Sequence, residues 1–234
     1  FFAGHVERIY GLFAPLSACQ VEQLRLWYRA NNDVEGVCAN DHAMSLKRYA
    51  DFPIELKDLC EQLASFFKKL YSHVDIAALR KKCGDIDDHY QAFVQTNKTG
   101  KCPFCGINDL LGEHHSTREA YDHYLPKALY PFNSINFRNL VPACHHCNSS
   151  YKTSKDPAYT PKDPTRGPHR RAVFYPYKAA SHSIEVQVSL KCFDIDKLTP
   201  DQISLEFGPA AIQQEIETWK DVYGIEEQIG RAHV

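Results

Sequence analysis

The first 97 residues space their apolar and polar positions as amphipathic helices do. Apolar residues recur at steps of three and four in "CQVEQLRLWYRA", "LKDLCEQLASFFKKLYSHV" and "DIDDHYQAFVQ". Pro53 stands where it can open a helix that starts near Ile54. We therefore predict a helical N-terminal region over residues 1–97, in which these segments pack against one another.

The pattern changes after residue 97, where turn residues, cysteine pairs and short apolar runs replace the long periodic segments. Residues 156–168, "DPAYTPKDPTRGP", are rich in proline and charge and predict an extended surface connection. Beyond it, "HSIEVQVSLKCF" alternates as a half-buried strand does, "QISLEF" suits its partner, and "AAIQQEIETWKDVYGI" predicts an amphipathic helix. We expect a small core over 98–156 and a C-terminal extension over 157–228.

Composition narrows the class of protein. At 234 residues with 44% hydrophobic content the chain can bury a sizeable core, and a net charge of -2 argues against a general nucleic-acid binder. No apolar run approaches the roughly 20 residues of a membrane span, and "FFAGHVERIY" lacks the features of a signal peptide. We expect a soluble, cytoplasmic protein with no membrane partner. "IGRAHV", residues 229–234, resembles a reading frame of a sequencing adapter, so we expect an artefact there and truncation at both ends.

Two cysteine pairs predict a metal site. Cys102 and Cys105 lie in "CPFCG", Cys144 and Cys147 lie in "CHHC", and 38 residues separate the pairs. Two residues between thiolates let both sulfurs reach one ion at about 2.3 Å, so four of them make a closed, structural zinc site. The alternatives are four buried cysteines or a redox pair, which would need a βαβ pattern beside it. His145 and His146 could replace a thiol ligand, but four thiols suffice, and we expect both histidines to be exposed.

The segment between the cysteine pairs carries a family resemblance. "CPFCG … YDHYLPKALYP … FRNLVPACHHCNSSYK" resembles the HNH endonucleases, the ββα-metal nucleases, in the subclass with a four-cysteine zinc clamp. The resemblance covers about 55 residues, Cys102 to Asp156. It implies an α+β fold, in which a small zinc-clamped ββα-metal nuclease core lies between the helical N-terminal region and the C-terminal strand-plus-helix extension.

The resemblance also implies roles for single residues. His123 would be the general base, Asp122 would bind the catalytic metal, and Asn139 would orient the base by holding the loop between the strands. The third motif position is usually a metal-binding histidine, whereas this chain has Asn148. An amide oxygen is a hard ligand that suits Mg²⁺ or Mn²⁺, so this departure shifts the expected catalytic metal toward magnesium.

The residue types by themselves favour phosphodiester hydrolysis. A histidine with an ordinary pKa of ~6.5 can accept a proton from water near neutral pH. A divalent ion held by Asp122 and Asn148 would stabilise charge on the phosphate and on the departing oxygen. For His123 the alternative is a satisfied core histidine, but the neighbouring acid and the two asparagines together favour a base.

A basic stripe follows the expected catalytic helix. From His145 to Lys178 the chain has seven Lys or Arg against two acids. The alternative is an ordinary solvated surface. Interleaved aromatic residues favour contacts with nucleic-acid phosphates by the following side chains, none of which would read base sequence: Lys152, Lys155, Arg166, Arg170 and Arg171.

The leading functional hypothesis is a metal-dependent HNH endonuclease that cuts DNA in preference to RNA. Its helical flanks resemble those of bacterial anti-phage or mobile-element nucleases, some of which work beside an ATPase partner; this step is an analogy. A second hypothesis is a catalytically silent zinc module that binds nucleic acid or protein. A third is a ribonuclease or effector toxin on the same scaffold.

Overall fold

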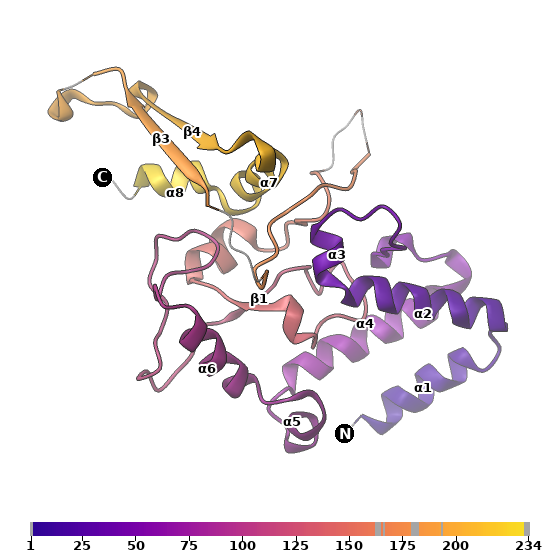
Figure 1. Cartoon of the computed structure of the whole chain (residues 1–234). Coiled ribbons are helices and arrows are strands. Elements are labelled where there is room, and N and C mark those ends of the chain that lie inside the picture. Colours follow the sequence, from indigo (N-terminus) through magenta and orange to yellow (C-terminus); the bar gives the residue numbers. More distant parts are fainter. Residues whose placement is uncertain (1, 162–164, 166, 179–182, 193, 232–234) are drawn as a thin grey trace.

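The computed structural model describes residues 2–161, 165, 167–178, 183–192 and 194–231 (Figure 1). The fold is α+β, as predicted. The described α-helices are α1 (Ala3–Phe13), α2 (Ala18–Asn32), α3 (Val34–Cys38), α4 (Lys57–Ser72), α5 (Ala77–Cys83), α6 (Ile86–Thr96), α7 (Gln213–Tyr223) and α8 (Ile225–Arg231). The strands β1 (Tyr121–His123) and β2 (Leu140–Pro142) form one antiparallel sheet, and β3 (Glu185–Leu190) and β4 (Ile203–Gly208) form another.

Shorter turns of helix connect these elements. Six are 3-10 helices: η1 (Tyr49–Asp51), η2 (Ile54–Leu56), η3 (Phe137–Asn139), η5 (Ile195–Lys197), η6 (Pro200–Gln202) and η7 (Ala210–Ile212). The element η4 (His146–Lys152) is a π-helix. Single π turns of this kind are rare and frequently occur at functional sites.

The three helices predicted from periodicity are confirmed as α2, α4 and α6. Ser17 and Gln20 form a capping box that starts α2. Pro53 precedes the 3-10 turn η2, which leads directly into α4. The apolar faces of α2 and α4 meet Phe132 of the central segment in one buried cluster. The helical region therefore packs directly against the loop between β1 and β2.

The central unit runs strand, loop, strand, helix, and its two strands lie near the middle of the molecule (Figure 1). In the β1–β2 register, Asp122 pairs with Val141 and His123 pairs with Leu140. One hydrophobic cluster includes Val37 of the N-terminal region, Val141 of β2 and Ile225 of α8. All three predicted segments therefore share a core around this small sheet.

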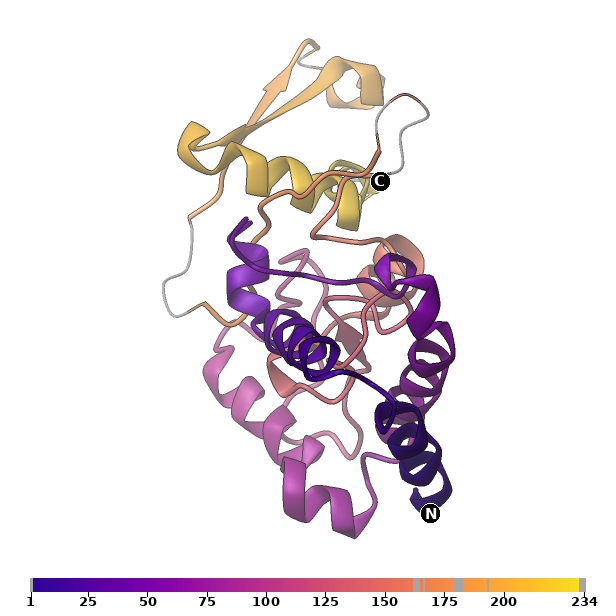
Figure 2. The same ribbon diagram turned by 90° about the vertical axis from the view of Figure 1, so that its right-hand side faces the viewer.

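The C-terminal extension lies at the opposite end of the molecule from α1 (Figure 2). The predicted pairing of its two strands is confirmed, with Val188 opposite Leu205. The expectation that the first strand is half-buried is wrong, because every residue of β3 is exposed. Only β4 is covered, where Phe207 packs against Trp219 of α7. In a two-stranded ribbon with one helix beside it, β3 stays in solvent although its apolar and polar residues alternate.

No helix in the described ranges combines the length and the apolar character needed to cross a bilayer. Of the segment expected to be an adapter artefact, residues 229–231 belong to the end of α8, and residues 232–234 lie outside the described ranges.

Candidate functional site

The two cysteine pairs come together in a buried cluster. The sulfurs of the four cysteines all lie within 4.8 Å of one another, and the Sγ atoms of Cys105 and Cys144 are 4.0 Å apart. A tetrahedral zinc ion with Zn–S bonds of about 2.3 Å separates its sulfurs by roughly 3.8 Å. The four cysteines are therefore close enough together to hold a zinc ion. His145 and His146 are both exposed and lie outside this cluster.

Two side-chain amides donate hydrogen bonds to the sulfurs. The Nδ2 of Asn108 donates to the Sγ atoms of Cys105 and Cys144, both at 3.5 Å. The Nε2 of Gln228, in α8, donates to the Sγ of Cys147 at 3.5 Å. Donors of this kind stabilise thiolates, the form that binds zinc. Sequence spacing gave no sign of either amide.

Asp122 is buried and forms an ion pair. Its Oδ1 accepts a hydrogen bond of 2.8 Å from the Nζ of Lys152, the last residue of η4. The side chain of Lys152 is fully buried. The same Nζ donates to the main-chain oxygen of His123 at 2.8 Å. Burial raises the pKa of Asp122, and the charge of Lys152 opposes that rise. The second carboxylate oxygen, Oδ2, is buried and has no hydrogen-bond partner among the described residues.

This geometry corrects the expectation that Lys152 contacts a substrate phosphate. Its ammonium is inside the molecule and already bonded to Asp122. A lysine in a basic run is usually solvated, so the sequence gave no reason to expect burial. Lys152 instead ties the π-helix to β1.

His123 faces away from the π-helix. Its Nε2 lies 3.1 Å from the main-chain oxygen of Ser134, and its ring contacts Tyr71 of α4, with centroids 4.2 Å apart at 74°. A carbonyl oxygen can only accept, so Nε2 carries the proton and Nδ1 keeps its lone pair. Burial and the charge of Lys127 lower the pKa of His123 to about 3. The imidazole is therefore neutral at neutral pH.

Asn139 holds the loop that follows β1. Its Oδ1 accepts from the main-chain N of Leu125 at 2.7 Å, and its Nδ2 donates to the main-chain oxygens of Leu125 at 3.1 Å and Asn133 at 3.4 Å. The side chain is fully buried. These bonds fix the backbone two residues beyond His123, which is the geometry that the predicted orienting role requires. That role stays a prediction.

Asn148 lies in η4, four residues before Lys152, and its side chain is half-buried. Residues one turn apart share a helix face, so Asn148 and Lys152 lie on the same side of η4. Among the bonds of the described residues, none directly joins the side chains of Asp122, His123 and Asn148. The free Oδ2 of Asp122 and the amide oxygen of Asn148 are hard donors. Oxygen donors of this kind are the ligands that Mg²⁺ prefers in proteins.

The rest of the basic stripe also differs from expectation. Arg171 is buried and pairs with Asp221 of α7 at 2.7 Å. Lys155 is exposed, but its Nζ donates to the main-chain oxygen of Asp221 at 2.8 Å. Arg170 donates to the main-chain oxygen of Val37 at 3.2 Å. Arg166 lies outside the described residues. Lys155, Arg170 and Arg171 therefore fasten the connection after η4 to α3 and α7.

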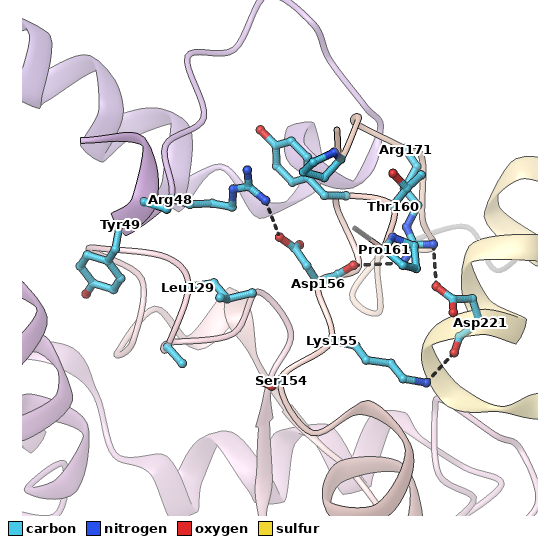
Figure 3. Close-up of a pocket in the computed structure, with 14 residues that line it drawn as sticks. Arg48, Tyr49, Leu129, Ser154, Lys155, Asp156, Thr160, Pro161, Arg171 and Asp221 are labelled. Carbon is cyan, nitrogen blue, oxygen red and sulfur yellow. Dashed lines mark hydrogen bonds and ion pairs between the residues drawn. The ribbon is translucent and has the colours of Figure 1, made fainter. Parts of the chain in front are cut away.

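A cavity of about 820 Å³ lies beside this connection, lined among others by Arg48, Lys155, Asp156, Arg171 and Asp221 (Figure 3). Its charges are paired with each other, as in the contact of 3.9 Å between Arg48 and Asp156. None of the residues predicted to bind the catalytic metal or to take the proton lines it. The cavity lies where the N-terminal helical region, the central core and the C-terminal extension meet.

The similarity to known proteins is limited to part of the chain. Over 78 residues it is 33% identical to the Septu protein PtuB of Bacillus thuringiensis, and this match covers 32% of the chain and 29% of that protein. The match thus spans about three tenths of the length of this curated relative. No family model matches the chain. No solved structure matches it either.

Proposed function

We propose that this protein is a metal-dependent HNH endonuclease that hydrolyses phosphodiester bonds of DNA and acts in bacterial anti-phage defence. The observation that carries the proposal is the hydrogen bond of His123. Its Nε2 donates to Ser134, which leaves a neutral imidazole with a lone pair on Nδ1. His123 ends the short strand β1, directly after Asp122, whose carboxylate is buried.

Each predicted residue has a task in this proposal. His123 accepts a proton from the attacking water at Nδ1, and Asn139 keeps the loop after β1 in place. Asp122 Oδ2 and the Asn148 amide would hold Mg²⁺ or Mn²⁺. Such an ion, when bound, neutralises charge on the phosphate and on the departing 3′ oxygen. Lys152 fixes Asp122 through its other oxygen, so one carboxylate oxygen is left to face the ion.

The similarity to a Septu protein supports the defence role. An ATPase or another protein of the same defence system is the partner that this role implies. The second candidate is a zinc module that binds nucleic acid or protein without cutting. The buried pair of Asp122 and Lys152 favours it, because a salt bridge already compensates most of the carboxylate charge.

Plasmid cleavage distinguishes the two candidates. Wild type, His123→Ala and the control His42→Ala, whose histidine is exposed, are incubated with DNA or RNA in Mg²⁺, Mn²⁺ or EDTA. Loss of a general base costs about 10²–10⁴-fold in rate, so His123→Ala should lose cleavage while His42→Ala keeps it. Equal cleavage by both variants would refute the proposed mechanism. Cleavage of RNA alone would favour a ribonuclease on this scaffold.

A further inference from the structure

His123 has a cation beside it that the basic stripe does not include. The ring of Tyr71, which contacts His123, also lies under Lys127, whose Nζ is 4.2 Å from the ring centroid. An ammonium this close to an aromatic face is attracted by the negative charge of the ring face. Tyr71 thus places a positive charge next to the proposed base.

A second cation lies on the same face of α4. Lys68 is three residues before Tyr71, so the two side chains are neighbours on the helix surface, and Lys68 is exposed. Burial and the charge of Lys68 both lower the pKa of Lys127. In the described part of the chain, neither lysine has a carboxylate within ion-pair distance.

Lys68 and Lys127 both neighbour Tyr71, and an anion bound beside them would offset their positive charges. The contrast with the basic stripe is direct. Lys152 and Arg171 are buried in ion pairs, and Lys155 is bonded to the end of α7. Lys68 and Lys127, in contrast, are available to a ligand, and Lys127 lies over the tyrosine ring that contacts the imidazole of His123.

We propose that Lys68, Tyr71 and Lys127 form a phosphate-binding surface, here called the α4 basic surface, on which the DNA backbone lies next to His123. Lys68 and Lys127 contact backbone phosphates, and Tyr71 positions Lys127 by holding its ammonium over the ring. The N-terminal helical region thereby supplies part of the substrate site. The identity of the substrate rests on the proposed function, whereas the location of the surface does not.

DNA binding tests the α4 basic surface directly. Anisotropy of a short labelled DNA duplex is measured without added divalent ion, between about 50 and 200 mM salt, for the full chain and for Lys68→Met and Lys127→Met. Methionine keeps much of the aliphatic stem and removes the charge. The matched control is Lys69→Met, because Lys69 is the exposed neighbour of Lys68 and its Nζ lies 2.7 Å from the Nε2 of His5. Zinc content and circular dichroism show that each variant is folded.

The logarithm of the binding constant falls linearly with the logarithm of the salt concentration, and each lost phosphate contact should make this slope shallower by about 0.9. At 0.1 M salt this corresponds to about eightfold weaker binding. Lys69→Met should bind as wild type does. The α4 basic surface is wrong if the Lys68 and Lys127 variants bind like Lys69→Met, or if wild type binds no duplex. Plasmid cleavage separates the two proposals. If the Lys68 and Lys127 variants bind DNA more weakly but the wild type never cuts plasmid, the α4 basic surface stands and the nuclease proposal is rejected. If these variants bind DNA as wild type does and the wild type cuts plasmid, the nuclease proposal stands and the α4 basic surface is rejected.

Discussion

Replacing Lys152 by methionine should lower the free energy of unfolding by about 3–5 kcal/mol, the usual result of removing one partner from a buried ion pair. The pair is almost completely removed from water, with Lys152 at 0% and Asp122 at 3% exposure, and the two groups are 2.8 Å apart. The variant would leave the carboxylate buried with neither oxygen hydrogen-bonded in the structure. It would also leave the His123 main-chain oxygen without its Nζ donor.

The loss of unfolding free energy in Lys152→Met should increase with pH. Burial raises the pKa of Asp122 and Lys152 lowers it, so Lys152→Met raises this pKa further. Below about pH 3.9 the carboxyl is protonated in both the folded and the unfolded chain, and removing Lys152 costs least. As the pH rises, the Asp122 carboxyl ionises first in the unfolded chain, because its pKa is higher in the folded chain. The difference in stability between wild type and variant therefore grows from acid pH toward neutral pH.

Urea unfolding of the zinc-loaded chain, followed by circular dichroism, measures this deficit. Lys155→Met is the control, because its ammonium is at the surface and surface changes usually stay near 0.5 kcal/mol. The double variant Asp122→Leu, Lys152→Met should recover most of the loss, since apolar replacements of a buried pair are often neutral. A loss below about 1 kcal/mol for Lys152→Met, or no recovery in the double variant, would refute the buried pair.

Three further outcomes are expected. Asn108→Ala should weaken zinc binding by about 10–100-fold in a chelator competition, because its amide donates to two of the sulfurs; unchanged affinity would mean that those bonds are absent. Asn139→Ala should destabilise the chain by about 1–3 kcal/mol in urea and should reduce cleavage, because it frees both main-chain groups of Leu125; full activity at full stability would contradict its role. Gly224→Ala should lower the melting temperature, because Gly224 has φ 59° and an added Cβ would lie 2.4 Å from Tyr151 Cδ1. The control Gly11→Ala should leave the melting temperature unchanged, because no atom lies within 4 Å of its added Cβ.

Local pattern was sufficient to predict several elements. Three- and four-residue periodicity predicted α2, α4 and α6, because an amphipathic helix shows its buried face within a few turns of sequence. Two-residue alternation predicted the pairing of β3 and β4. The C-x-x-C spacing predicted the four-cysteine cluster, because each pair already brings two sulfurs within reach of one ion.

Burial and long-range partners could not be predicted in this way. The pattern of β3 resembles that of a covered strand, and only the absence of a second layer over it makes its residues exposed. The charge of Lys152 predicted contact with solvent or phosphate, and only the packing of η4 against β1 buries it beside Asp122.

The sequence by itself determined which side chains the central segment carries, namely the thiols, the carboxylate, the imidazole and the amides. The tertiary structure alone decided their partners. Tyr71 and Lys127 meet at His123 because α4 packs beside the loop after β1, and Gln228 reaches Cys147 across 81 residues of chain. Such contacts depend on how elements pack together, and periodicity reports only on neighbours along the chain.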